Sequence, residues 1–365
     1  MNRNCQGYGR NAAAASMAVI QATNATLLEQ RRCRSGRSPG RIDTSARRDM
    51  AMIAIVTVRN DVHAVAICGQ VRRLGYPDCH IIECDQLAQG RNIHYAVGVD
   101  AGRDWVLTSD GSPIAISQTR VIWLRRPRAN QNLNTPLTEE DGYHLVNNDC
   151  RGALSGYLAT HFRGKWISHP EATFRASDKL YQQEVARACG FRVPKTIVTQ
   201  SADEVGKFFL ECDGKVIVKT VVGADLTLET KKIADPSFFS DEAYSASPAI
   251  YQECIEGTKH LRLLNFGDRS MCGLIETDNL DWRMHLDESI TPWKVPDDLN
   301  RRVRMVIERL GLEMGIVDIK LTPGGEPVWL EVNPQGQFIF LEPLTGLPFV
   351  EMFSRYLIEE ATSLA

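Results

Sequence analysis

Several features are missing from this sequence, and their absence excludes broad classes of protein. No stretch approaches the ~20 apolar residues of a membrane-spanning helix, so we expect neither a membrane anchor nor a membrane partner. The 10 cysteines form no CxxC pair and no zinc-finger spacing, so they signal neither a zinc site nor a disulfide framework. Reduced thiols are typical of the cytoplasm, where we expect the protein to be.

The loop after the first predicted strand lacks glycine. That strand, 52–58, is followed by Arg59-Asn60-Asp61, an amphipathic helix at 62–74 and a second strand at 80–84. This order predicts a small α/β domain. A dinucleotide-binding Rossmann site is excluded, because its fingerprint requires glycines in that loop.

Lysine is absent from residues 1–49, which contain nine arginines and three acidic residues. This segment therefore carries +6 and the remainder −9, because the whole chain has a formal charge of −3. A slightly acidic body gives no support to a nucleic-acid partner, and we expect none. In composition, residues 1–49 partly resemble a secretory signal peptide or an organellar transit peptide. We favour a disordered extension or a start codon assigned too early.

Two short apolar strands within residues 315–337 carry the strongest chemical signal. Gly324-Gly325 predicts a two-residue hairpin turn. A turn centred there places Asp318 opposite Glu331, and alternation puts Asn333 on the face of Glu331. Opposed carboxylates among apolar residues are unfavourable unless a cation pairs with them. Oxygen ligands alone suit Mg²⁺, so we predict a metal site here. A solvent-exposed acidic hairpin is the alternative.

An Asp on one strand and Glu-x-Asn on the next resembles the metal site of ATP-grasp ligases. Other motifs resemble the ATP-grasp ribosomal-peptide maturases of the microviridin type, with an MvdD-like N-terminal domain. The matching segments include Trp123-Leu124-Arg125-Arg126, Asp178-Lys179-Leu180, Leu261-Arg262-Leu263, Asp281-Trp282-Arg283, Trp329-Leu330-Glu331-Val332-Asn333 and Thr345-Gly346-Leu347-Pro348. The Arg125-Arg126 pair is suited to carboxylates or phosphates, with an ordinary surface pair as the alternative.

The resemblance implies an α/β (α+β) chain with the ATP-grasp fold. It has an N-terminal α/β pre-ATP-grasp domain, a small lid domain and a C-terminal antiparallel-sheet metal-binding domain. A chain of 365 residues is long enough for this. The expected divisions are an extension at 1–49, the pre-ATP-grasp domain at 50–165, the lid subdomain at 166–250 and the catalytic subdomain at 251–365. The resemblance also implies a homodimer.

The resemblance assigns nucleotide contacts to lysines and to a hinge strand. Lys179 and Lys219 would meet ATP phosphates, although a solvated lysine is the ordinary alternative for each. Gly223 matches a phosphate-covering loop only weakly. The hinge residues expected to bind the nucleotide are Gln252, Glu253, Ile255 and Glu256.

One position departs from the family pattern. Relatives usually offer an acid to the ribose hydroxyls where this chain has His260. The ribose is then held either by a weaker contact at His260 or by Glu256.

The implied reaction has ATP and Mg²⁺ as cofactors, with Mn²⁺ as an alternative metal, bound by Asp318, Glu331 and Asn333. A substrate carboxylate attacks ATP, and a nucleophile displaces phosphate from the acyl phosphate. Arg262 and Arg283 are the candidate catalytic residues, because a planar guanidinium binds such oxygens bidentately. Structural ion pairing is the alternative role for both.

Three functions compete. The first is macrocyclisation, through ester or amide crosslinks, of a ribosomally made precursor peptide that carries a leader segment. The second is addition of an amino acid such as glutamate to a protein or to a small-molecule carboxylate. The third is a non-catalytic nucleotide-binding regulatory protein. An intact metal triad argues against the third.

We predict that residues 1–49 are dispensable, because their composition offers too little periodic apolar surface to offset the entropy of ordering. A chain that starts at Met50 or Met52 should fold and retain activity. Soluble yield and ATP binding of the truncated chain test this. An insoluble product, or one that no longer binds ATP, would contradict the prediction.

Overall fold

The computed structural model describes residues 51–90, 92–98, 104–133, 140–222, 230–235, 239–284 and 289–363. The basic extension and Gly223 lie outside these residues. All described residues belong to one compact unit, Ala51–Met284 with Glu288–Ala365. No helix in this described part is long and apolar enough to cross a membrane.

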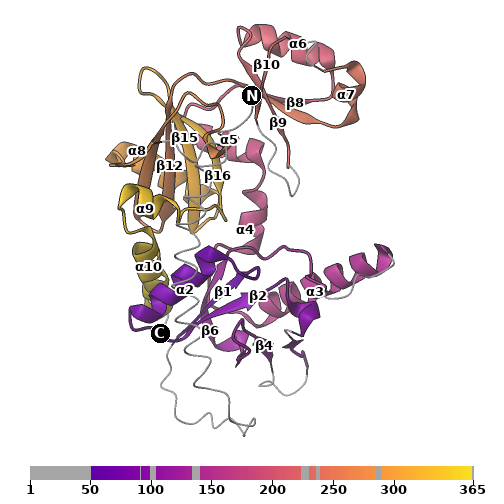
Figure 1. Ribbon diagram of the computed structural model, residues 1–365, viewed down its shortest axis with the longest axis vertical. Helices are drawn as coiled ribbons and strands as arrows, with labels where there is room; N and C mark the ends of the chain where they lie inside the picture. Colours follow the sequence, from indigo (N-terminus) through magenta and orange to yellow (C-terminus); the bar gives the residue numbers. More distant parts are fainter. Residues whose placement is uncertain are drawn as a thin grey trace, which may run out of the picture. The chain divides into compact units, whose positions relative to one another are not determined.

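The first sheet is parallel and has the order β2-β1-β6-β7 (Figure 1). Its strands are β1 (Met52–Thr57), β2 (Cys79–Glu83), β6 (Thr119–Leu124) and β7 (Lys165–Ile167). Strand β1 is apolar and almost wholly buried, as expected for a parallel strand covered on both faces. Helix α2 (Val62–Arg73) begins at Asp61, whose carboxylate accepts the amide hydrogen of His63 at 2.8 Å. The predicted strand, helix and strand are confirmed within one residue at each end.

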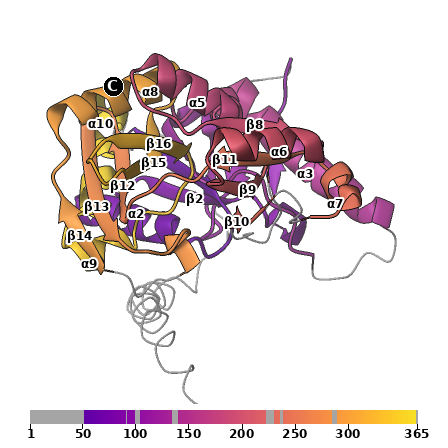
Figure 2. The same ribbon diagram turned by 90° about the horizontal axis from the view of Figure 1, so that it is seen from above.

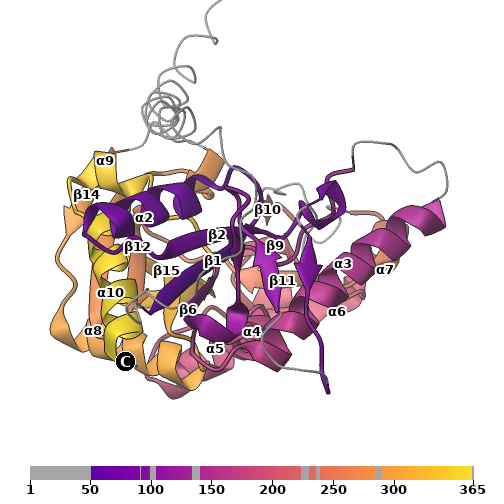
Figure 3. The ribbon, with the colours of Figure 1, turned by 90° about the horizontal axis from the view of Figure 1, so that it is seen from below.

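The C-terminal helix α10 (Phe349–Ser363) returns to this first sheet and packs beside α2 (Figure 3). Its Phe353 meets Trp123 of β6 edge-on, with ring centroids 4.9 Å apart. The remaining elements of this part are α3 (Glu140–His161), the strands β3 (Ile93–His94), β4 (Trp105–Leu107) and β5 (Pro113–Ile114), and the 3-10 helices η1 (Leu87–Gln89) and η2 (Ile116–Gln118).

The second sheet is antiparallel, with the order β10-β9-β11-β8. Its strands are β8 (Thr196–Thr199), β9 (Val216–Thr220), β10 (Lys231–Ile233) and β11 (Ala249–Glu253). Helices α6 (Ala202–Glu211) and α7 (Asp241–Ala246) supply Phe208 and Tyr244 to its own small core. This sheet therefore has an apolar core of its own.

The third sheet is antiparallel, with the order β14-β13-β12-β15-β16 (Figure 2). Its strands are β12 (Lys259–Phe266), β13 (Arg269–Glu276), β14 (Ser289–Trp293), β15 (Met314–Leu321) and β16 (Pro327–Asn333). The helices associated with it are α4 (Pro170–Arg175), α5 (Lys179–Ala188), α8 (Asp297–Arg309), α9 (Leu341–Thr345) and the 3-10 helix η3 (Trp282–Met284).

Side chains on β12 and β15 alternate between two environments. Leu261, Leu263 and Val317 join residues of α5 and α8 in one buried cluster. Leu264 and Ile316 face the other way and join the core beneath α10. Alternation therefore fixes the face of the sheet on which the polar residues of β12 and β15 lie.

The hairpin between β15 and β16 corrects one prediction and confirms another. The turn is not a two-residue turn at Gly324-Gly325. Thr322 and Glu326 close a three-residue loop through a 3.0 Å backbone hydrogen bond, with Gly325 left-handed at φ 82°. The cross-strand residue pairs nearest this loop are shifted by one position from the predicted register. A β-bulge at Leu330 then restores the predicted register. Asp318 therefore does pair with Glu331.

The predicted divisions at 165 and 250 both fall inside strands. Strand β7, Lys165–Ile167, completes the first sheet, and β11, Ala249–Glu253, lies within the second. The division of the chain into separate domains remains a prediction.

Gly257, after β11, provides a test of how tightly the second sheet is joined to the third. Its φ is 124°, and an added Cβ would lie 2.2 Å from the carbonyl oxygen of Leu321 in β15. Gly75 is a matched control, since its φ is 89° and nothing lies within 4 Å of an added Cβ. Both Ala variants should lose the roughly 1–2 kcal/mol of a left-handed residue. Gly257→Ala should lose about 1–3 kcal/mol more through steric overlap. Urea unfolding measures both losses, and equal losses would contradict the predicted overlap.

Candidate active site

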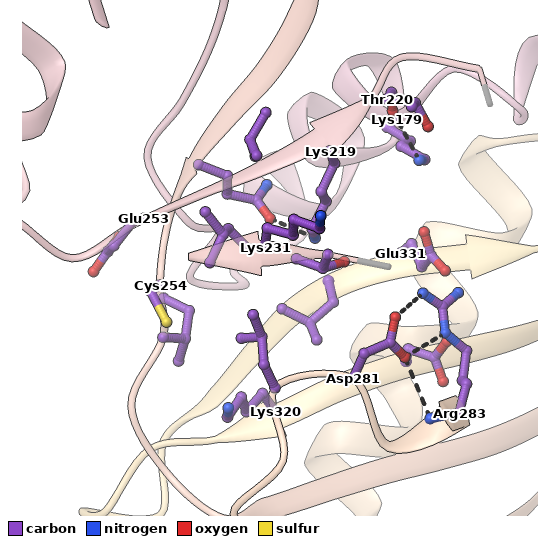
Figure 4. A pocket seen from close by; sticks show the side chains of 18 of the residues that line it. Lys179, Lys219, Thr220, Lys231, Glu253, Cys254, Asp281, Arg283, Lys320 and Glu331 are labelled. Atoms are coloured by element: carbon purple, nitrogen blue, oxygen red, sulfur yellow. Dashed lines mark hydrogen bonds and ion pairs between the residues drawn. The ribbon is translucent and has the colours of Figure 1, made fainter. Parts of the chain in front are cut away.

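A cavity of about 840 Å³ opens between strands of the second and third sheets (Figure 4). This size is typical of small-molecule sites. Nine of the predicted site residues line it: Lys179, Lys219, Gln252, Glu253, Ile255, His260, Arg283, Asp318 and Glu331. Glu256, Arg262 and Asn333 do not line it. The structure thus brings together predicted residues that span more than 150 positions in the sequence.

Two lysines enter the cavity from different elements. Lys179 is the first residue of α5, which Asp178 caps by accepting the amides of Leu180 and Tyr181. The Lys179 ammonium donates to the carbonyl oxygen of Thr220 at 3.3 Å. Neither the cap nor this contact neutralises Lys179, so its charge is available to a ligand.

Lys219 lies on β9 and is half-buried. Its ammonium donates to Gln252 Oε1 at 2.8 Å, and Gln252 in turn donates to Thr196 Oγ1 at 2.9 Å. Burial lowers the pKa of Lys219, and the nearby Glu331 carboxylate opposes this. A neutral amide thus orients Lys219 without cancelling its charge.

The two carboxylates of the hinge, Glu253 and Glu256, are already engaged by other residues. Glu253 accepts from Arg192 at 2.8 Å and from the Lys195 amide at 3.1 Å, and Figure 4 shows its side chain directed away from Lys219. Glu256 pairs with Lys215 at 2.7 Å, outside the cavity lining. Among the described residues, the Ile255 amide has no backbone hydrogen-bond partner. The arrangement gives no support to Glu256 as the ribose acid.

Asp318, on the floor of the cavity, forms a buried ion pair with Arg262, which does not itself line the cavity. Arg262 of β12 is the cross-strand neighbour of Asp318, and its Nη1 lies 2.9 and 2.7 Å from the two carboxylate oxygens. Its Nη2 donates to the carbonyl oxygen of Gln337 at 2.9 Å, and its guanidinium lies 5.4 Å from the ring centroid of Trp282. Both terminal nitrogens of Arg262 are therefore held by internal partners, whereas its Nε is buried without a hydrogen-bond partner in the described structure.

Asp318 is buried and faces a second carboxylate across the hairpin, Glu331. Burial raises the pKa of Asp318, Arg262 opposes the rise, and the Glu331 charge adds to it. A cation between the two carboxylates would relieve both the burial cost and the repulsion. The donor set fits a hard divalent cation in this respect.

The third predicted metal ligand, Asn333, already accepts a hydrogen bond within the protein. Asn333 is exposed, and its Oδ1 accepts the Gln335 amide at 2.9 Å. No group of three or more His, Cys, Asp or Glu residues is placed to hold a metal in the described ranges. Two carboxylates alone do not complete the coordination sphere of a metal ion, so the Asn333 amide, water or the bound substrate would have to supply the remaining ligands. The assignment of this metal site therefore stays a prediction.

Arg283 faces the cavity from η3. Its Nε and Nη2 each donate to Asp281 at 2.7 Å. Burial alone would raise the pKa of Asp281, but Arg283 holds it below its ordinary value. The Asp281 side chain is 4% exposed and that of Arg283 is 42% exposed. Asp281 thus anchors one edge of the guanidinium and leaves the rest open to a ligand.

The position where the family pattern expects an acid holds a neutral histidine. Burial, with the nearby charge of Lys320, lowers the pKa of His260 to about 4. Its cross-strand neighbour is Lys320, which also lines the cavity. Sequence reasoning missed Lys320. The signal was present, because a lysine two residues beyond Asp318 in a strand must share its face.

The Arg125-Arg126 pair binds a carboxylate, and that carboxylate is internal. Arg125 is fully buried, and both arginines lie within 4 Å of Asp61 at 3.8 and 3.6 Å. Arg125 Nη1 also donates to the carbonyl oxygen of Gln335. Arg125 therefore joins the first sheet to the segment that follows the hairpin, whereas Arg126, whose side chain is 43% exposed, contributes an ion pair to Asp61.

His63 makes a second junction between the first sheet and this segment. Its Nε2 accepts the amide of Phe338 at 2.9 Å and that of Ile339 at 3.3 Å. Burial, then the charge of Arg125, lowers the pKa of His63 to about 3, so the ring is a neutral acceptor. Sequence reasoning missed His63, since its role depends on a segment 275 residues away.

Comparison with known proteins gives consistent neighbours. No family model matches the sequence. The α-aminoadipate–LysW ligase LysX of Sulfurisphaera tokodaii is 21% identical over 54% of this chain and 79% of its own length. N5-carboxyaminoimidazole ribonucleotide synthase of Mycobacterium bovis is 25% identical over 41% of this chain and only 37% of its own length.

Solved structures match over far more of the chain. Macrocyclase MdnC of Microcystis aeruginosa, bound with precursor peptide MdnA, gives a TM-score of 0.76 at 20% identity, covering 84% of this chain and 99% of MdnC. The peptide-associated ATP-grasp ligase of Chryseobacterium gregarium, in complex with ADP and a leader and core peptide, gives 0.73 at 20% identity, covering 87% and 98%. At such identities the likeness establishes architecture. The chain therefore has the ATP-grasp fold, in the form found in the peptide macrocyclases that its motifs resemble.

Proposed function

We propose that this protein is an ATP-dependent ligase that activates a carboxylate as an acyl phosphate, and that it macrocyclises a ribosomally made precursor peptide. The observation that carries the proposal is the charge of the cavity lining. Glu253, Asp281 and Asp318 are each paired with an arginine. Within the described lining, four lysines then face one carboxylate without an ion-pair partner, Glu331. Such a cavity suits a polyanion bound together with a cation.

The residues have separate roles in this proposal. Lys179 and Lys219 hold the phosphates, and the hinge backbone at Glu253 and Ile255 holds the base. Asp318, Glu331 and Asn333 would hold Mg²⁺, or Mn²⁺, which neutralises charge on the transferring phosphoryl group when bound. Because Arg262 is already held by Asp318, we assign it the positioning of that ligand.

Arg283 is the residue proposed to bind the acyl phosphate. Asp281 fixes its Nε and Nη2, and Nη1 has no hydrogen-bond partner in the described chain. A fixed, partly exposed guanidinium is pre-organised for the developing oxyanion. A substrate carboxylate then attacks the γ-phosphate, and a hydroxyl or amine displaces phosphate from the product.

The peptide substrate is supported by the neighbours whose structures contain precursor, leader or core peptides. A homodimer and a cytoplasmic location remain part of the proposal. The alternative is addition of an amino acid to another molecule, which the likeness to an α-aminoadipate–LysW ligase favours.

The deciding experiment combines the protein with Mg²⁺, ATP and short Thr- and Asp/Glu-rich peptides encoded beside its gene. Cyclisation gives one ADP and the loss of one water from the peptide for each crosslink. Amino-acid addition instead gives a gain in mass when free amino acids are supplied. Asp318→Asn and Glu331→Gln should abolish ADP formation in folded protein. Tight ATP binding without ADP release for any substrate would favour the regulatory alternative.

Replacing Arg283 tests the mechanism directly. Arg283→Lys should fail nearly as badly as Arg283→Ala, because a point charge cannot reproduce a bidentate fork. We expect a loss in product formation on the order of 3 kcal/mol, near a hundredfold, with little change in ATP affinity.

Arg301→Lys is the matched control for this test, since Arg301 pairs with Asp298 on the exposed surface of α8. It should retain parent activity. ATP affinity, ADP release and ring formation are measured separately for all three variants. If the Arg283→Lys enzyme forms rings at near the parent rate, Arg283 is reduced to a structural residue.

A further inference from the structure

The cavity floor carries two cross-strand pairs, and only one of them is balanced. Arg262 opposes Asp318, and the two form the ion pair described above. Two residues along, His260 opposes Lys320 on the same face. Directly opposed side chains of this kind lie about 5 Å apart at Cβ. The second pair therefore places two basic side chains together with no acid between them.

Both members of this pair are buried against the cavity. His260 is 5% exposed and Lys320 is 7% exposed. The Nε2 atom of His260 has no hydrogen-bond partner in the described structure. Within the described residues, Lys320 has neither an ion-pair partner nor a hydrogen bond from its ammonium. Buried donors and charges without partners are costly, and both residues line the cavity.

The pair lies at the hinge end of the cavity. In Figure 4, Lys320 lies toward Cys254, while Arg283, Glu331 and Lys179 occupy the opposite side. The charge of Asp281 acts on His260, but Asp281 is held by two hydrogen bonds to Arg283. The basic pair is therefore distinct from the phosphate end of the proposed nucleotide site.

We propose that Lys320 and His260 form an anion subsite that takes a phosphate group beside the sugar of the bound nucleotide. The subsite supplies one ammonium and one imidazole nitrogen from adjacent strands, a donor set that matches phosphate oxygens. Two sources share this chemistry: a phosphate ester on the sugar, or free inorganic phosphate bound next to it. The place of the subsite beside the sugar rests on the nucleotide orientation in the proposed function. The ability of Lys320 and His260 to bind an anion does not rest on it.

The test compares adenosine 5′-phosphate with adenosine 2′,5′-bisphosphate and adenosine 3′,5′-bisphosphate by calorimetry, with inorganic phosphate as a separate probe. We expect one bisphosphate to bind about tenfold or more tightly than the monophosphate, the usual effect of a charge-assisted contact. Lys320→Met keeps the apolar stem and should remove this preference. It should also raise the melting temperature of the unliganded protein, because a buried charge is lost.

Lys259→Met is the matched control, since Lys259 precedes His260 on β12 but is exposed, pairs with Glu276 and does not line the cavity. It should keep the bisphosphate preference. Equal binding of all three nucleotides, with no binding of phosphate that depends on Lys320, would overturn the subsite. So would a preference that survives Lys320→Met. Phosphate binding that depends on Lys320, without a bisphosphate preference, would support the subsite and identify the free anion as its ligand.

Failure of the proposed function is distinguishable from failure of the subsite. If no adenine nucleotide binds, the ligase proposal fails, and phosphate binding to parent and Lys320→Met protein still decides the subsite. If Lys320→Met does not fold, the comparison of nucleotides and phosphate in the parent protein decides it alone.

Discussion

The Arg262–Asp318 pair is the interaction on which the geometry of the cavity floor depends. It lies between two strands whose other faces are packed with Leu261, Leu263 and Val317, so neither charge can turn toward water. Burial favours the neutral form of Asp318 and raises its pKa, and the Arg262 guanidinium opposes this rise. Glu331 on the next strand faces Asp318, so a cation bound between the two carboxylates would favour their ionised forms. Pre-organisation of this kind is what electrostatic catalysis requires.

The first sheet contributes to the site without lining it. Its Asp61, Arg125 and His63 form a buried network that ends on the backbone of residues 335–339. The same segment carries the Gln337 carbonyl that accepts from Arg262. A chain of hydrogen bonds therefore runs from Arg125 to this segment, and from this segment through Arg262 to Asp318. These contacts are consistent with the first sheet and the cavity floor belonging to one compact unit.

The arrangement could be predicted from the sequence wherever local rules govern it. Apolar periodicity located β1, α2 and β2. The pairing of Asp318 with Glu331 was predicted correctly, but the reason was incomplete. The loop is one residue longer than the predicted two-residue turn, and the bulge at Leu330 cancels this difference. Contacts between distant segments could not be predicted in this way. Glu256 was a candidate for the ribose, yet Lys215 holds it outside the cavity. Local pattern limits the possible partners, and only the tertiary fold selects among them.

The floor of the cavity also shows how one sheet face can hold charge for two different purposes. Arg262 and Asp318 satisfy each other, so the protein itself offsets the cost of burying them. His260 and Lys320 occupy equivalent positions one pair further along, where the acid that acts on His260, Asp281, is held by Arg283. The fold tolerates that cost because the surrounding cores are large and the pair borders the cavity instead of the apolar interior. A charge without a partner at the wall of a cavity is stabilised when a ligand supplies the opposite charge. The His260–Lys320 pair is therefore the part of the cavity floor that we expect to respond most strongly to a bound ligand.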